Sequence, residues 1–384
     1  MGIAVEKSFV LFCAGEDSGD ILGQRLVETC VNSGLKACGS GGARMLSAGL
    51  QPIVDFEHLP VSGFGDVLSN YKKLSVDFEQ MQQALCRKDC MAFVAIDYPG
   101  FNMKLVKLAK KLGKPVLYVA PPQIWAWKSN RAKSLRGIPL AVFYDFELNA
   151  YHKYGCCARL MQHPIMEANV VHDSVKTNEV ILLPGSRLAQ AKRNLETFLN
   201  PAMNVAIQGD VECGRVTVFA VRESLVKPFA EIIERLKKDN FHCEIQVEKP
   251  SEFAGKRLER YSKASLALVC PGTATLEVAL ANCPMVICTK PDALTYVLGN
   301  LLVRSPVLGL PNLILHEKRF EEYVVSPFAS RNSVLAKIAM LSKKAKENPT
   351  TGVAGLLRSK MSCGISAQKL MLEFLGEFVK GQSH

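Results

Sequence analysis

The strongest constraint on this chain is an alternation of short apolar runs with helical stretches, which begins again near the middle of the sequence. Such an alternation is typical of parallel β-sheets covered by helices. A chain of 384 residues is also longer than one ordinary core accommodates. We therefore predict an α/β protein with two doubly wound, Rossmann-like domains. The predicted strands are residues 8–14, 91–96, 115–119, 140–143, 179–183, 216–221, 242–247, 266–270 and 285–288, and the predicted helices include 21–32 and 104–112.

A polar stretch without clear periodicity, residues 162–178, separates the two series and is the predicted linker. It leaves an N-terminal domain at 1–165 and a C-terminal domain at 175–349. Residues 350–384 carry a further helical pattern, and we expect this tail to pack back on the first domain. Doubly wound domains bind ligands at the carboxyl ends of their strands, so the expected site is the cleft between the two domains.

The net charge of +11 suggests a partner that carries phosphate. No nucleic-acid-binding motif is present, so we expect no nucleic acid. Lysines and arginines cluster at 104–114 and 128–136. They form either a solvated helix face or a face that rests on anionic lipid headgroups. The apolar run at 9–14 is too short for a signal peptide, and no run approaches the roughly 20 residues of a membrane span. We expect a cytoplasmic protein, attached peripherally to the inner face of the cytoplasmic membrane.

The 13 cysteines do not indicate a metal site. Most of them lie inside apolar runs, where cysteine behaves as a small buried hydrophobe. Cys86 and Cys90, and the pair Cys156 and Cys157, lack histidine or cysteine partners at zinc-ligand spacing. The loop after the first strand reads GEDSGD, with acidic residues where a dinucleotide would need glycines. We predict no metal and no cofactor.

The first phosphate-loop candidate is the segment LPGSR, which follows a predicted strand and opens a helix. Backbone N–H groups at a helix N-terminus bind anions, and here they belong to the turn that contains Gly185 and Ser186. Arg187 adds a cation that can bind a phosphate through two parallel hydrogen bonds. The alternative is an ordinary turn between a strand and a helix.

The second candidate is CPGTATLE at 270–277, again between a buried strand and a helix. Gly272 allows close approach of a ligand to the backbone, while Thr273 and Thr275 offer hydroxyl groups. Glu277 falls in the first turns of the helix, where its carboxylate can accept both hydroxyls of a ribose. The alternative for Glu277 is interaction with the helix dipole. The two loops together favour a nucleoside diphosphate as ligand.

Eight short motifs appear in the order found in lipid-A-disaccharide synthases, and this chain resembles that family. The motifs span most of the chain, from about residue 10 to about residue 325. Each motif alone is weak evidence, whereas the ordered series is strong. They are AGEDSGD at 14–20, GGARM at 41–45, IDYPGFN at 96–102, WAW at 125–127, HP at 163–164, LLPGSR at 182–187, GTATLE at 272–277 and LPN at 310–312.

The resemblance implies the GT-B architecture, in which two Rossmann-like domains face each other and the C-terminal one holds the nucleotide. It implies transfer of a 2,3-diacylglucosamine unit from UDP-2,3-diacylglucosamine to 2,3-diacylglucosamine 1-phosphate. The products are a β-linked lipid A disaccharide 1-phosphate and UDP, formed with inversion and without a required metal. It also makes Asn102 and Asn312 candidates for substrate binding. A homodimer remains an option.

An inverting transfer needs a carboxylate that takes the proton of the acceptor hydroxyl. Asp97 ends a buried strand and is our first candidate for this general base. Glu16 is the second candidate, or else orients the acceptor. The neighbouring residues Ser18, Gly19 and Asp20 are predicted to line the acceptor side. The alternative for Asp97 is a carboxylate that merely ends a strand.

Several positions depart from the family pattern, and they allow altered kinetics or altered acyl preference. They are Ser62, Gly100, Gln162, Gln190, Pro271 and Asp145, the last of which replaces the proline of a PFE segment. Two rival functions stay open: a related enzyme such as a UDP-N-acetylglucosamine 2-epimerase, and a non-catalytic protein that binds sugar nucleotides. The AGEDSGD and WAW segments speak against the first, and the presence of Asp97 and Arg187 speaks against the second.

Overall fold

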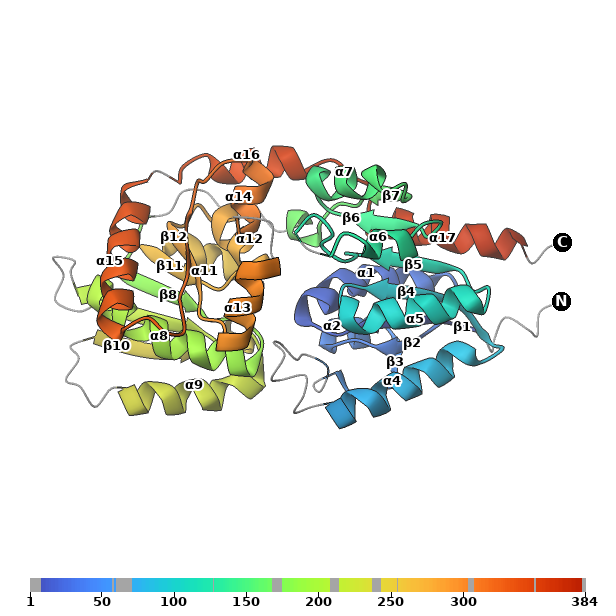
Figure 1. Ribbon diagram of the computed structural model, residues 1–384, viewed down its shortest axis with the longest axis horizontal. Helices are drawn as coiled ribbons and strands as arrows, with labels where there is room; N and C mark the ends of the chain where they lie inside the picture. The colour runs from blue at the N-terminus through green and yellow to red at the C-terminus, as the bar shows by residue number, and fades with distance from the viewer. Residues whose placement is uncertain are drawn as a thin grey trace. The chain divides into compact units, whose positions relative to one another are not determined.

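A computed structural model shows two compact α/β units in the chain (Figure 1). The first unit runs to Met166 and takes up the chain again at Met361, and the second contains Glu167–Lys360. No helix in the described part of the chain is both long enough and apolar enough to cross a membrane. The structure describes residues 8–56, 59, 71–126, 128–167, 175–207, 214–236, 243–253, 255–302, 307–348 and 350–381.

The first unit is built on a parallel seven-stranded sheet with the order β3-β2-β1-β4-β5-β6-β7. The order reverses between β1 and β4, which is the switch point where such sheets bind ligands. The four strands predicted for this half are present as β1, β4, β5 and β6, while β2, β3 and β7 were not predicted. The strands are β1 Phe9–Ala14, β2 Lys36–Ser40, β3 Leu50–Pro52, β4 Cys90–Ile96, β5 Val116–Val119, β6 Leu140–Val142 and β7 Ala158–Leu160.

Helices connect these strands, and two of them begin earlier than predicted. The helix predicted at 21–32 starts at Asp17, and the helix predicted at 104–112 starts at Pro99, a residue suited to a first helical turn. The helices are α1 Asp17–Asn32, α2 Ala43–Ser47, α4 Tyr71–Cys86, α5 Pro99–Lys111, α6 Arg131–Ser134, α7 Asp145–Lys153 and the 3₁₀ helix η2 Pro164–Glu167.

The C-terminal helix α17, Ala367–Gly381, also belongs to the first unit and packs against α1. Just before it, the backbone N–H of Gln162 donates to the carbonyl of Ile365 at 2.9 Å. Arg159 and Glu373 form an ion pair across the same junction, with 2.6 Å between Nη1 and Oε2. The end of the chain is therefore fastened to the sheet edge at β7.

The second unit contains a parallel six-stranded sheet with the order β10-β9-β8-β11-β12-β13. All five predicted strands are present, and only β13 was missed. The strands are β8 Glu179–Leu183, β9 Gly214–Phe219, β10 Cys243–Glu248, β11 Leu266–Val269, β12 Met285–Thr289 and β13 Glu321–Val324. The helices are α8 Leu188–Ile207, α9 Glu223–Leu236, α10 Pro250–Phe253, α11 Arg257–Lys263, α12 Thr273–Leu280, α13 Ala293–Leu302, α14 Leu310–Leu315, α15 Arg331–Glu347 and α16 Val353–Met361.

Helices cover both faces of this sheet. On one face α8, α9 and α15 share a core with alternate strand residues such as Val180, Leu182 and Val218. The residues between them point to the other face, where α12 packs against β11 and β12. Burial on both faces explains why these strands read as continuous apolar runs in the sequence.

Candidate active site

The turn after β4 holds Asp97 in an unusual backbone conformation. Asp97 and Tyr98 both lie in the left-handed region, with φ of 47° and 48°. This region is unfavourable for residues other than glycine, and such strain is found preferentially at functional sites. The turn is held by its own hydrogen bonds. The N–H of Asp97 donates to the carbonyl of Val119, and the hydroxyl of Tyr118 donates to the carbonyl of Asp97, both at 2.9 Å.

The side chain of Asn102 also holds this turn in place through hydrogen bonds. Its side chain is fully buried. Its Nδ2 donates to three carbonyls, those of Cys13 at 3.0 Å, Ile96 at 3.3 Å and Asp97 at 2.9 Å. These bonds join the ends of β1 and β4 and so position Asp97. A direct contact between Asn102 and a substrate stays a prediction.

The loop after β1 lies beside this turn, because Ala14 pairs with Ile96 in the sheet. Glu16 is the N-cap residue of α1 and is partly exposed. The hydroxyl of Ser18 lies 3.5 Å from Oδ2 of Asp97. The structure thus brings Glu16, Ser18 and Asp97 to one edge of the sheet, where the neighbouring strands β1 and β4 end.

Two glycines of this loop are needed for close packing. A Cβ on Gly15 would lie 2.3 Å from the ring of Tyr98, whose hydroxyl is fixed by donation to the carbonyl of Leu59 at 2.9 Å. A Cβ on Gly19 would approach the Cβ of Ala14 to 3.2 Å. Contact of Gly19 with a substrate stays a prediction.

The Asp20 side chain binds to the backbone of helix α2 and not to solvent. Its carboxylate accepts hydrogen bonds from the N–H groups of Arg44 at 3.1 Å and Met45 at 2.9 Å, in the first turn of α2. The AGEDSGD and GGARM segments are therefore linked physically, because the first caps the helix of the second. Burial raises the pKa of Asp20, and these hydrogen bonds oppose the rise. A contact between Asp20 and a substrate stays a prediction.

An aromatic cluster lies at the ends of β5 and β6. The rings of Trp125 and Phe146 meet edge to face at 5.2 Å between centroids, and Phe146 stacks on Tyr144 at 5.3 Å. His163 packs against Phe143 at 4.8 Å, and burial lowers its pKa to about 4, so the imidazole is neutral at physiological pH. Trp127 of the WAW motif lies outside the described residues, as does Ser62, one of the positions that depart from the family pattern.

Glu147 in the first turn of α7 is a functional candidate that sequence reasoning missed. Its Oε2 accepts a hydrogen bond from the N–H of Phe143 at 3.1 Å. Burial raises the pKa of Glu147 to about 7, and the negative charge of Asp97 acts in the same direction. The only sequence signal was its place in the DFE segment, whose relation to Asp97 depends on the fold.

In the second unit, the loops after β8, β11 and β12 lie side by side. Gly185 has φ of 117°, and a Cβ there would lie 3.4 Å from the sulfur of Cys270. Burial raises the pKa of Cys270 to about 11, and the nearby charge of Arg187 opposes the rise. Asn194 on α8 donates to the carbonyl of Pro184 at 2.8 Å and accepts from the N–H of Lys290 at 2.7 Å. Ser186 and Arg187 remain partly exposed beside these loops.

The GTAT loop has open space beside Gly272, whereas its Thr275 is buried in the protein. Gly272 has φ of 148°, and a Cβ there would meet no atom within 4 Å, so a ligand can approach its backbone. Thr273 is partly exposed at the start of α12. Thr275 is fully buried and donates to the carbonyl of Gly272 at 2.8 Å. Thr275 therefore shapes the loop, and its contact with a ligand stays a prediction.

Glu277 and Asn312 make protein contacts of different kinds. Glu277 Oε1 lies 3.3 Å from Nη1 of Arg257, a residue of α11 that sequence reasoning did not single out. The amide of Asn312 is buried and bonds on both sides. Its Nδ2 donates to Phe320 O and Glu322 Oε1, both at 2.8 Å, while its Oδ1 accepts from the N–H groups of Arg319 and Phe320 at 2.9 and 2.8 Å. Asn312 thus organises the loop before β13, and direct binding of a substrate by either residue stays a prediction.

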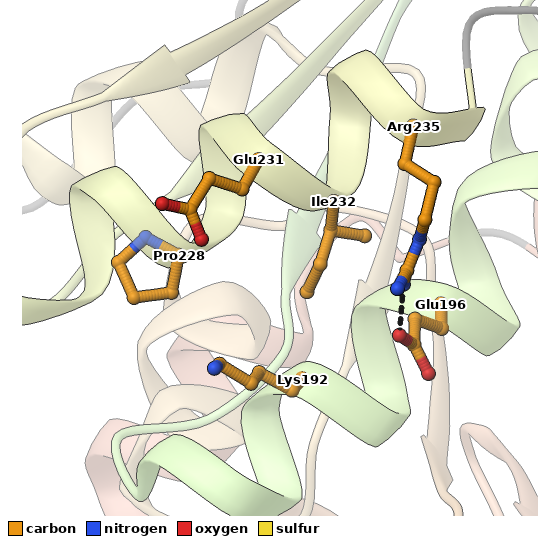
Figure 2. Close-up of a pocket in the computed structure, with 6 residues that line it drawn as sticks. All are labelled: Lys192, Glu196, Pro228, Glu231, Ile232 and Arg235. Atoms are coloured by element: carbon orange, nitrogen blue, oxygen red, sulfur yellow. Dashed lines mark hydrogen bonds and ion pairs between the residues drawn. The ribbon is translucent and has the colours of Figure 1, made fainter.

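A surface hollow between α8 and α9 is a separate feature (Figure 2). Charged side chains of both signs line it, including Lys192 and Glu231, and Arg235 is paired with Glu196 across it. None of the predicted site residues lines this hollow.

Solved structures of low sequence identity share the fold of this chain. An S. aureus MnaA–UDP co-structure matches with a TM-score of 0.56 and 11% identity, covering 91% of this chain and 94% of that chain. The calicheamicin glycosyltransferase CalG4 matches with a TM-score of 0.53 and 11% identity, covering 97% and 99%. The predicted fold class is confirmed: the chain has two Rossmann-like domains and the GT-B fold.

The particular family follows from the sequence relatives. The family model of lipid-A-disaccharide synthetase matches residues 10–363. The lipid-A-disaccharide synthase of Trichlorobacter lovleyi is 31% identical over 361 residues, covering 88% of this chain and 89% of that protein. The enzyme of Coxiella burnetii (strain Dugway 5J108-111) is 29% identical over 380 residues, covering 94% and 96%. The chain belongs to the lipid-A-disaccharide synthase family and is a hexosyltransferase of lipid A biosynthesis, which confirms the predicted family and activity.

Proposed function

We propose that this chain transfers a 2,3-diacylglucosamine unit from UDP-2,3-diacylglucosamine to 2,3-diacylglucosamine 1-phosphate, with inversion at the transferred carbon. The observation that carries the proposal is the strained turn at Asp97, which a network of buried hydrogen bonds maintains. Maintaining a carboxylate in this conformation costs free energy of about 1–3 kcal/mol per strained residue, which is expected where the carboxylate has a chemical task.

In this proposal Asp97 is the general base that takes the proton of the acceptor hydroxyl. Ser18, 3.5 Å from the Asp97 carboxylate, orients it or the incoming hydroxyl. Glu16 is the partly exposed N-cap residue of α1, and Asp20 in the first turn of the same helix holds α2 in place. Glu16 is therefore the second candidate for the base.

The second unit is proposed to bind the UDP part of the donor. The N–H groups at Gly185 and Ser186 and the open backbone at Gly272 suit the diphosphate. Arg187 neutralises the charge that develops on departing UDP. Glu277, already paired with Arg257, accepts the ribose hydroxyls.

Attachment to an anionic membrane surface is part of the same proposal. Lys104, Lys107 and Lys111 are exposed along α5, where they can contact lipid headgroups. Two neighbouring lysines serve the fold instead. Lys110 Nζ donates to the carbonyl of Arg136 at 3.0 Å, and Lys114 Nζ donates to that of Arg87 at 2.9 Å.

The test is incubation of the purified chain with UDP-2,3-diacylglucosamine, with and without the 1-phosphate acceptor. UDP release that depends on the acceptor, together with a β-linked disaccharide product by NMR, is the expected result. Conversion of UDP-N-acetylglucosamine to its 2-epimer would support the rival enzyme class. Tight UDP binding without any turnover would support a non-catalytic binding protein.

A further inference from the structure

Helix α13, Ala293–Leu302, is apolar and yet lies on the surface of its unit. It contains no charged residue. Of its side chains that the structure describes, residues 293–301, none is buried. Leu294 is 51% exposed, Val297 46% and Leu301 75%. An apolar helix is normally buried against other elements, so this surface is built to be covered by something apolar.

The three large apolar residues among the exposed ones form one stripe, which we call the α13 stripe: Leu294, Val297 and Leu301. Their spacing of three and four residues places them on the same side of the helix, over a length of roughly 10 Å. Tyr296 lies on the other side of α13, and its charge acts on the hydroxyl of Tyr323 in β13. The α13 stripe is therefore a defined apolar surface on one side of this helix.

The start of α13 is fastened to the predicted phosphate loops. Asp292 accepts hydrogen bonds from the N–H and the hydroxyl of Thr295 at 2.9 and 2.7 Å, which caps the helix. Asp292 also pairs with Arg193 of α8 at 3.8 Å. Asn194, next along α8, bonds to both Pro184 and Lys290. The α13 stripe thus begins immediately beside the PGSR turn.

We propose that the α13 stripe binds the acyl chains of the sugar-nucleotide donor. This inference rests on the proposed function, in which the donor carries two acyl chains on the sugar attached to UDP. A diphosphate held at the PGSR turn leaves that sugar next to the start of α13, where its chains meet an apolar surface. A membrane-binding helix typically has lysines and arginines on its polar side, and α13 has none, which favours a substrate chain over a bilayer.

The test uses two variants, Leu294→Asn and Leu301→Asn, which place a polar amide on the stripe without emptying the core. Leu372→Asn is the matched control, because Leu372 is 48% exposed on α17 in the other unit. Binding of UDP and of non-transferable UDP-diacylglucosamine analogues with short and long acyl chains is measured by calorimetry, without bilayers. Circular dichroism and the melting temperature verify folding.

In the wild type, affinity is expected to rise with chain length, by up to roughly fourfold per methylene buried on the stripe. In the two stripe variants, the ratio of the affinity for long-chain analogues to that for short-chain analogues should fall by tenfold or more. UDP affinity should stay unchanged, and Leu372→Asn should behave as the wild type. Leu301→Met, which restores an apolar side chain, should recover most of the loss.

An unchanged dependence on chain length in both stripe variants overturns the inference. So does a loss of vesicle binding in those variants with unchanged affinity for the long-chain analogues, because the stripe would then be a membrane surface. Failure of the proposed transfer reaction is detected separately, since these measurements require only binding of the donor analogue.

Discussion

At the scale of single residues, the polar side chains around the strained turn at Asp97 are of two kinds: those that hold the turn and the carboxylate that is held. Tyr118 and Asn102 both donate hydrogen bonds to the carbonyl of Asp97, and they therefore position this residue. The Asp97 carboxylate, in contrast, has a neighbouring hydroxyl from Ser18 at 3.5 Å. A residue that is held by others at an energetic cost is a better candidate for chemistry than the residues that hold it.

Replacement of Asp97 by Asn keeps the shape of the side chain and removes its basicity. We expect turnover to fall by about 10²–10⁴-fold, while UDP affinity stays the same. Steady-state rates of UDP release and calorimetric titration with UDP measure the two effects. If Asp97→Asn retains near-normal turnover and Glu16→Gln does not, Glu16 is the base.

Replacement of Arg187 by Ala removes the cation of the PGSR turn. UDP binding should weaken by about 1.5–3 kcal/mol, the scale of a hydrogen bond to a charged group. Lys192→Ala is the matched control, because Lys192 lies on α8, directly after the PGSR turn, but lines the separate hollow in Figure 2. Equal UDP affinity in the two variants would contradict the assignment of Arg187 to the nucleotide site.

At the scale of elements, α7 carries a titratable group at its first turn. Glu147 has a pKa of about 7 in the folded protein, above its usual value of 4.5. Between these two values the folded chain holds a proton that the unfolded chain has released. The free energy of unfolding therefore falls as pH rises through this window, and it does not recover above pH 7.

Glu147→Gln removes this ionisation and keeps an oxygen for the N–H of Phe143. Relative to the wild type, the variant should gain on the order of 1–3 kcal/mol of stability between pH 5 and pH 8. Urea unfolding at several pH values provides the measurement, with Glu373→Gln on the exposed Arg159 pair as control. Parallel curves for the wild type and Glu147→Gln would show that this carboxyl does not titrate in the window.

Elements also show where prediction from sequence succeeds. Strands such as β4 and β8 are buried on both faces and read as apolar runs, so they were predicted. Of the four missed strands, β3, β7 and β13 are short edge strands, and β13 contains Glu321 and Glu322. Their pairing depends on a neighbouring strand and not on an apolar pattern of their own.

The site was predictable to the level of loops, but not to the level of side-chain contacts. Asp97 and Ser18 lie together because parallel strand ends meet at one edge, a relation that the order of elements implies. Asn312 and Thr275 instead bond within the protein. The direction of a polar side chain depends on partners distant in sequence, as with Arg257 beside Glu277.

At the scale of the whole molecule, the net charge of +11 predicts a salt-dependent association with membranes. Binding to vesicles that contain anionic lipid should fall steeply as salt is raised, because exposed charges are screened over about 8 Å at physiological ionic strength. Sedimentation with anionic and neutral vesicles is the measurement. Equal binding to both kinds of vesicle would contradict an electrostatic attachment.

Helix α13 also has a consequence for how enzymes of this kind diversify. None of its described side chains is buried, so its outward residues can change without disturbing the core. Its attachment to the predicted phosphate loops, in contrast, depends on Asp292 and Asn194, which lie outside the helix. The residues of such a helix can be exchanged for those of a relative while the position of the helix stays the same. From the proposed role of the α13 stripe, we expect that grafting the α13 residues of relatives that use longer or shorter fatty acids changes the chain length that the enzyme prefers.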